Sequence, residues 1–178
     1  MKKNSNLMCV CEGAIMIALA IVLSFLKFEI WPNGGSVDLV MIPILVFAFR
    51  RGGTWGIGAG LVFGTIKCII SGGVSYGWQS ILLDYSIAYA AVGVAGFFGN
   101  RPVLGTIVAG AARFFVHVLS GVFVWGWMPD EFFGMIMTNL WGYSCIYNLT
   151  YVLPNTVIAV AAIAMLYKKT KLITRISG

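Results

Sequence analysis

The chain has 178 residues, of which 60% are hydrophobic and only 10% are charged, and its mean hydropathy is +0.91. A soluble domain of this length keeps much of its surface in water, so this composition excludes a water-soluble protein. The net charge of +6 is not gathered into one solvent-exposed basic face. The charge pattern therefore argues against a nucleic-acid partner.

Apolar stretches that suit membrane helices follow one another along the chain. A hydrocarbon core about 30 Å thick needs roughly 20 predominantly apolar residues per helix. The predicted helices, in chain order, cover residues 7–26, 37–49, 53–71, 80–98, 103–123 and 142–167. We therefore predict an all-α integral membrane protein, a single domain over residues 1–178 with six transmembrane helices in the lipid bilayer.

The first predicted helix carries two further signals. Lys2 and Lys3 before an apolar run resemble a signal peptide, but no small-x-small cleavage pattern follows the run, so a retained helix is favoured. Ala14 and Ala18 lie four residues apart, and such a small-residue face allows a second helix to approach closely. Alanine is also a common helix filler, so this spacing alone leaves partner docking open.

The distribution of lysine and arginine predicts the orientation of the chain. With a cytoplasmic N-terminus and six crossings, Lys27 falls in an outer loop. Nine basic residues fall inside: Lys2, Lys3, Arg50, Arg51, Arg101, Lys168, Lys169, Lys171 and Arg175. Cytoplasmic segments of membrane proteins carry such an excess of positive charge. We expect both termini to be cytoplasmic.

Several familiar motifs are missing or lie in the wrong context. The chain has no P-loop, so energy for uphill transport must come from a partner or an ion gradient. The "GIGAG" at 56–60 predicts close helix packing through small residues rather than a dinucleotide site. The four cysteines lack metal-ligand spacing, so we predict no metal site and no cofactor.

Three predicted helices bring polar side chains to the same depth of the membrane. Asp84 lies about one turn below the outer surface, in a helix that runs inward. His117 is the only histidine, and it lies about 21 Å from the inner end of its helix. Tyr143, Tyr147 and Asn148 fall in the first two turns of the last helix. Ionisable side chains within membrane spans usually face a cavity, a partner or a pathway.

Two explanations of Asp84 are left open by these residues. It could form an internal ion pair with Arg113 or Lys67. It could instead meet a cationic aromatic ligand, through charge pairing and cation–π contacts with aromatic residues of the outer loops. His117 could equally be a packing histidine bonded to a backbone carbonyl, and the loop tryptophans also fit an interfacial belt.

Four blocks together resemble the thiamin-specific S components of energy-coupling factor transporters. They are "GGSVDLVMIPI" (34–44), "LLDYSIAYAAVGVAG" (82–96), "RFFVHVLSGVFVWG" (113–126) and "YSCIYNLTYVLP" (143–154). The resemblance implies a six-helix protein of the bacterial cell membrane that captures thiamin outside the cell. It also implies an energising module of one membrane scaffold protein, the T component, and two ATPase subunits. Ala14 and Ala18 match the scaffold-docking motif of that family.

The same resemblance assigns thiamin contacts to particular positions. They are Trp31, Asp84, Tyr85, His117, Trp125, Tyr143 and Asn148. Position 84 is acidic across the family, as Glu or Asp. Phe63 stands where a tryptophan is expected and residues 72–79 align poorly, so the roles of Phe63, Tyr76 and Trp78 are left open.

Other functions fit parts of the same sequence. An S component for another small vitamin or a pyrimidine-type ligand would use the same architecture. An intramembrane enzyme would use Asp84, His117 and Ser75, since "GVSYG" at 73–77 matches a nucleophile motif. That motif needs a strand on one side, whereas here it joins two membrane helices. We therefore predict a transport protein and not an enzyme.

Overall fold

The computed structural model describes residues 2–31, 34–73, 77–169 and 173. Its long helices are α1 (Lys2–Leu23), α3 (Gly53–Ile70), α6 (Pro102–Ser120) and α7 (Leu140–Lys169), and α2 (Met41–Arg51) is shorter. Between α3 and α6 runs a continuous helical rod of α4 (Trp78–Ser80), the π-helix η2 (Ile81–Ile87), α5 (Ala88–Val92) and the 3-10 helix η3 (Gly93–Phe98). A second π-helix, η4 (Gly121–Trp125), extends α6. The predicted all-α membrane fold is confirmed.

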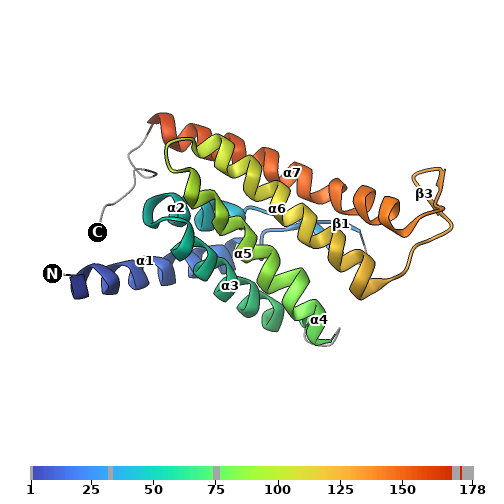
Figure 1. Ribbon diagram of the computed structural model, residues 1–178, viewed down its shortest axis with the longest axis horizontal. Coiled ribbons are helices and arrows are strands. Elements are labelled where there is room, and N and C mark those ends of the chain that lie inside the picture. The colour runs from blue at the N-terminus through green and yellow to red at the C-terminus, as the bar shows by residue number, and fades with distance from the viewer. Residues whose placement is uncertain (1, 32–33, 74–76, 170–172, 174–178) are drawn as a thin grey trace.

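Five of these helical rods are long and apolar enough to cross a bilayer. They are Asn6–Leu23, Gly53–Ile70, Trp78–Phe98, Pro102–Trp125 and Leu140–Lys169. The rods pack into one elongated bundle, with the start of α1 and the end of α7 at the same end (Figure 1).

The second predicted helix, 37–49, is displaced and shortened in the structure. Val37 ends strand β2 (Gly34–Val37), which pairs with the antiparallel strand β1 (Phe28–Trp31), and α2 begins only at Met41. At 11 residues, α2 is shorter than a membrane span requires. Most of its side chains are buried, as expected of a helix that is apolar on all sides and lies inside a bundle.

Asp38 explains why the helix does not start where hydropathy suggests. Its carboxylate accepts the backbone N–H of Val40 at 3.2 Å, and its own N–H donates to the side-chain oxygen of Asn155 on α7 at 2.8 Å. The amide of Asn155 in turn donates to the backbone carbonyl of Ser36 at 2.8 Å. Such local bonds offer the backbone an alternative to helix, and here they fix the base of the β1–β2 hairpin on α7.

Glycines on α3 allow it to pack closely against the rod that carries Asp84. A Cβ atom on Gly60 would lie 2.1 Å from the carbonyl oxygen of Tyr89, and one on Gly64 would lie 2.4 Å from that of Tyr85. The backbones thus meet at a distance that only glycine permits. The predicted small-residue packing at 56–60 is confirmed, and it fixes the depth of Asp84 relative to α3.

Helix α1 is the most loosely packed rod of the bundle, since only 17% of its apolar window is buried. Glu12 attaches α1 to α2. Its carboxylate forms ion pairs with Arg50 and with Arg51, and the Nη2 atom of Arg51 lies 2.5 Å from Oε2 of Glu12. Ala14 and Ala18 are exposed on its outer face. The structure thus leaves the small-residue face of α1 uncovered.

Candidate functional site

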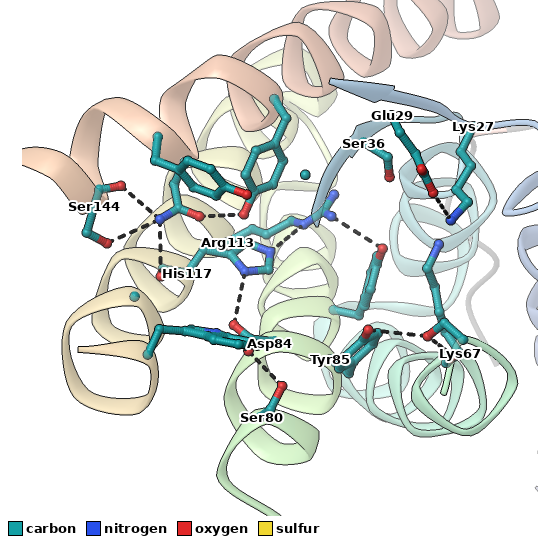
Figure 2. A pocket seen from close by; sticks show the side chains of 18 of the residues that line it. Lys27, Glu29, Ser36, Lys67, Ser80, Asp84, Tyr85, Arg113, His117 and Ser144 are labelled. Atoms are coloured by element: carbon teal, nitrogen blue, oxygen red, sulfur yellow. Dashed lines mark hydrogen bonds and ion pairs between the residues drawn. The ribbon is translucent and has the colours of Figure 1, made fainter. Parts of the chain in front are cut away.

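A cavity of about 610 Å³ opens between η2, α6, α7 and the β1–β2 hairpin. Its lining combines charged side chains, tyrosines and tryptophans, many of which appear in Figure 2. The lining residues are Lys27, Glu29, Gly35, Ser36, Lys67, Ser71, Ser80, Asp84, Tyr85, Tyr89, Arg113, His117, Gly121, Trp125, Trp127, Tyr143, Ser144, Tyr147, Asn148 and Tyr151. The volume is in the range of small-molecule sites in proteins.

Asp84 lies in the wall of this cavity and is held there by neutral donors. The hydroxyl of Ser80 donates to Oδ2 at 2.8 Å, and the indole Nε1–H of Trp125 donates to the same oxygen at 3.0 Å. The Nδ1 atom of His117 lies 3.8 Å from Oδ1. The side chain of Asp84 keeps 18% of its surface exposed, so the carboxylate is still accessible from the cavity.

Both Asp84 and Trp125 lie in π-helical segments, η2 and η4. A π-helical turn holds one more residue than an α-helical turn, and such segments occur often at functional sites. Here the two segments are joined by the hydrogen bond from Trp125 of η4 to Asp84 of η2.

Arg113 is buried behind His117, on the same face of α6. Its Nε–H donates to Nε2 of His117 at 3.3 Å, and its Nη2 donates to the hydroxyl of Tyr89 at 3.3 Å. The guanidinium carbon also lies 4.6 Å from the centre of the Tyr89 ring. In the described part of the chain, no carboxylate lies within ion-pairing distance of Arg113.

Helix α7 contributes a column of tyrosines. Tyr143, Tyr147 and Tyr151 are spaced four residues apart, with neighbouring ring centres 5.7 and 6.1 Å apart. The Tyr151 ring also packs edge-on against His117, at 5.7 Å between centres. Beside it, the amide of Asn148 donates to the Ser144 carbonyl at 2.8 Å and accepts a hydrogen bond from the Tyr151 hydroxyl.

A second buried acid, Asp38, lies near the opposite part of the cavity. Lys67 of α3 reaches its Oδ2 at 3.6 Å, and the side chain of Asp38 retains only 1% of its surface exposed. The Lys67 ammonium has no hydrogen-bond partner among the described residues. Its closest compensating charge is therefore the carboxylate of Asp38.

The β1–β2 hairpin forms another part of the wall. Gly35, at a φ of +81°, packs against the Tyr151 ring, where a Cβ atom would lie 2.7 Å from the ring. Lys27 and Glu29 form an exposed ion pair at 2.6 Å. The hydrogen bond from the Lys27 ammonium, with its charge, holds the pKa of the Glu29 carboxyl below its usual range.

Six of the seven residues that we expected at a ligand site line this cavity: Asp84, Tyr85, His117, Trp125, Tyr143 and Asn148. The seventh, Trp31, ends strand β1, and its side chain lies outside the described part of the structure. The expected ion pair of Asp84 with Arg113 or Lys67 is not formed, because Lys67 pairs with Asp38 and Arg113 contacts Tyr89 and His117.

The structure answers differently for each position whose role the sequence left open. Phe63 is fully buried and packs edge-on against Tyr89 at 4.7 Å, so it supports the wall from behind. Trp78 is 67% exposed and does not line the cavity. Tyr76 and Ser75 lie outside the described residues.

Some lining residues were missed from the sequence although a signal was present. Ser80 precedes Asp84 by four residues, which places both on one helix face. Tyr151 continues the four-residue spacing of Tyr143 and Tyr147. No sequence periodicity pointed to Asp38, because it lies in a turn that hydropathy assigned to a helix.

Comparison with known proteins places this architecture in a family. The family model described as "Thiamine transporter protein" matches residues 10–174. "Thiamine transporter ThiT" of Bacillus subtilis is 31% identical to this chain over 180 residues, which cover 94% of each chain. "Thiamine transporter ThiT" of Lacticaseibacillus paracasei is 29% identical over 189 residues, which cover 93% of this chain and 90% of the relative. A solved structure of ThiT from Listeria monocytogenes matches with a TM-score of 0.82 at 26% identity, covering 96% of this chain and 99% of that one. The chain belongs to the thiamine transporter family and is a multi-pass protein of the bacterial cell membrane.

Proposed function

We propose that the chain captures thiamin on the outer side of the cell membrane and takes part in its uptake. The observation that carries this proposal is the environment of Asp84, an accessible carboxylate with neutral donors around it and aromatic rings beside it. Thiamin carries a fixed thiazolium charge and an aminopyrimidine. A carboxylate can pair with the first group or accept a hydrogen bond from the second.

The remaining lining residues would share the recognition of the two rings. Trp125 and Tyr143 present aromatic faces, which attract a cation and stack on flat rings. Tyr85 presents a hydroxyl to the cavity, where the Ser71 hydroxyl donates to it at 3.3 Å. Asn148 is buried with its amide already bonded to Ser144 and Tyr151, so we expect it to orient the tyrosine column.

Uptake against a gradient would need an external source of energy. The chain has no nucleotide-binding motif, so we propose that it works with an energy-coupling factor module of a membrane scaffold and two ATPase subunits. The exposed pair Ala14 and Ala18 on α1 would be the docking face for the scaffold. Replacing both alanines by tryptophan should abolish uptake in cells while the purified protein still binds thiamin.

We further propose that both termini are cytoplasmic, as the basic residues favour. With the four native cysteines replaced by serine, a cysteine placed at Asn100 should then resist a membrane-impermeant maleimide added to whole cells. A matched cysteine at Asp130 should react. Labelling at Asn100 from outside would reverse the assigned orientation of the cavity.

The decisive experiment is titration of the purified protein with thiamin, read by quenching of tryptophan fluorescence. Saturable quenching by thiamin, with no response to a neutral vitamin such as riboflavin, supports the proposal. Preference for another small vitamin would support the alternative of a different substrate within the same transporter class. Recovery of unchanged thiamin after long incubation would distinguish a binding protein from an enzyme.

A further inference from the structure

The relation between Arg113, His117 and Asp84 determines where the proton of the only histidine resides. Arg113 donates its Nε–H to Nε2 of His117 at 3.3 Å, so Nε2 must offer a lone pair. A neutral imidazole has one protonated and one unprotonated nitrogen. The proton of His117 must therefore be on Nδ1, the nitrogen that lies 3.8 Å from Asp84 (Figure 2).

Protonation of His117 would conflict with this arrangement. An imidazolium carries protons on both nitrogens, so its Nε2–H would point at the Nε–H of Arg113. The two groups would also bring two positive charges together in a buried site, because Arg113 is 4% exposed and remains charged at all relevant pH values. Arg113 therefore opposes a positive charge on His117 through both hydrogen bonding and charge.

We propose that Arg113 is a positioning residue that keeps His117 neutral, so that the negative charge of Asp84 stays available for a cationic ligand. An imidazolium at 3.8 Å would neutralise Asp84 and compete with the ligand for it. With His117 neutral, Ser80 and Trp125 orient the carboxylate as uncharged donors, and the Nδ1 atom of His117 lies 3.8 Å from its other oxygen. This inference rests on the proposed function in one respect only: thiamin supplies the positive charge of the ligand.

The other groups around His117 are consistent with this role. On α7, the Tyr151 ring packs against the imidazole, and Asn148 donates to the His117 backbone carbonyl at 3.3 Å. On α5, Tyr89 contacts Arg113 rather than His117. The remaining buried acid in this region, Asp38, is paired with Lys67. Among the described neighbours, Asp84 is thus the group that favours an imidazolium and Arg113 the group that opposes it.

The first test needs no ligand. Because His117 is the only histidine, ¹⁵N-histidine labelling gives a single imidazole whose tautomer and charge are read by NMR in detergent micelles. We expect a neutral ring with the proton on Nδ1, unchanged between pH 8 and pH 6. An imidazolium at pH 7, or a proton on Nε2, would falsify the proposal whether or not the protein binds thiamin.

The second test compares variants over the same pH range. Arg113→Met removes the charge and the donor, and Arg113→Lys keeps the charge on a different donor. The double variant Lys67→Met with Asp38→Asn is the matched control, because it removes a buried cation from the same cavity without touching His117 and leaves no buried charge unpaired. We expect the NMR signal of His117 to titrate in Arg113→Met and to stay neutral in the other two proteins.

Thiamin affinity provides the functional measure. If the imidazole of Arg113→Met titrates at the ordinary histidine midpoint near pH 6.5, about a quarter of the protein is competent at pH 6, and affinity falls roughly fourfold between pH 8 and pH 6. The same titration of the unmodified protein corrects for protonation of thiamin itself. Adding His117→Gln to Arg113→Met should remove the pH dependence.

The outcomes separate this inference from the proposed function. Parallel pH profiles for the unmodified protein and Arg113→Met would overturn the role of Arg113 while leaving thiamin capture intact. Absence of thiamin binding at every pH would refute the proposed function, whereas the NMR result would still decide the state of His117. If Arg113→Met does not fold, the spectra of the unmodified protein and of Arg113→Lys still decide whether His117 stays neutral beside a cation.

Discussion

Asp84 and Asp38 are both carboxylates within an apolar bundle, yet their surroundings assign them different tasks. Asp38 has a cation beside it, Lys67 at 3.6 Å, and its side chain is closed off from the cavity at 1% exposure. Asp84 has uncharged donors around it and remains 18% exposed. A buried acid already paired with a cation contributes to the fold, whereas an accessible acid without one can bind a cationic ligand.

Helix α3 takes part in both arrangements. It supplies Lys67 to Asp38, and its glycine face sets the distance to the rod that carries Asp84. The same rigid helix therefore stabilises the hairpin base on one side and positions the ligand acid on the other. Substitutions at the two acids and on α3 should separate these contributions.

The largest effect is expected for Asp38→Asn. This change leaves the ammonium of Lys67 buried without a counter-charge, and breaking a buried ion pair costs about 3–5 kcal/mol of stability. We expect earlier thermal unfolding in detergent. Adding Lys67→Met should restore much of the lost stability, because no buried charge is then unpaired. If Asp38→Asn alone is as stable as the parent protein, the pair of Asp38 and Lys67 does not stabilise the fold.

Asp84→Asn should show the opposite pattern. It keeps the size of the side chain but removes its charge, and a hydrogen bond to a charged group is worth about 1.5–3 kcal/mol, so thiamin affinity should fall roughly ten- to a hundredfold. Stability should change little, because a neutral amide is less costly than a carboxylate within a membrane. Tryptophan quenching measures the first effect and thermal unfolding the second. Normal binding by a variant that melts early would exclude Asp84 as a ligand residue.

Gly60→Ala tests whether close packing of α3 positions Asp84. The new Cβ atom would lie 2.1 Å from the Tyr89 carbonyl oxygen, and overpacking of this kind costs about 1–3 kcal/mol. Gly58→Ala is the matched control, because a Cβ atom there meets nothing within 4 Å. We expect lower thermal stability and weaker thiamin binding for Gly60→Ala but not for Gly58→Ala. Equal behaviour of the two variants would mean that the rods can separate without consequence.

The smallest effect is expected for Ser80→Ala. It removes one donor from Asp84, but the Trp125 bond to the same oxygen and the charge of the carboxylate remain. Thiamin affinity should therefore fall less than in Asp84→Asn, roughly two- to tenfold, or about 0.5–1.5 kcal/mol. Ser24→Ala is a suitable control, since Ser24 donates to the Ile21 carbonyl, outside the cavity lining. A loss as large as that of Asp84→Asn would show that orientation of the carboxylate matters as much as its charge.

The sequence by itself determined the membrane class, the approximate helices and six of the residues that line the cavity. Hydropathy is a property of a local window of residues, so it identified the long rods without knowledge of their packing. The shared depth of Asp84, His117, Tyr143 and Asn148 followed from helix direction, and the structure places these residues around one cavity. The close packing at 56–60 was also readable, because small residues at helical spacing imply it.

Only the tertiary structure decided which charges pair with one another. Asp84, Lys67 and Arg113 lie on three different rods, and no local pattern states which of them meet. The shortening of α2 depended on bonds between Asp38 and Asn155, which are 117 positions apart in the chain. The π-helical turns at Asp84 and Trp125 have no periodic signature in hydropathy either. These features arise from long-range contacts, and those contacts make one buried acid part of the fold and leave the other open to a ligand.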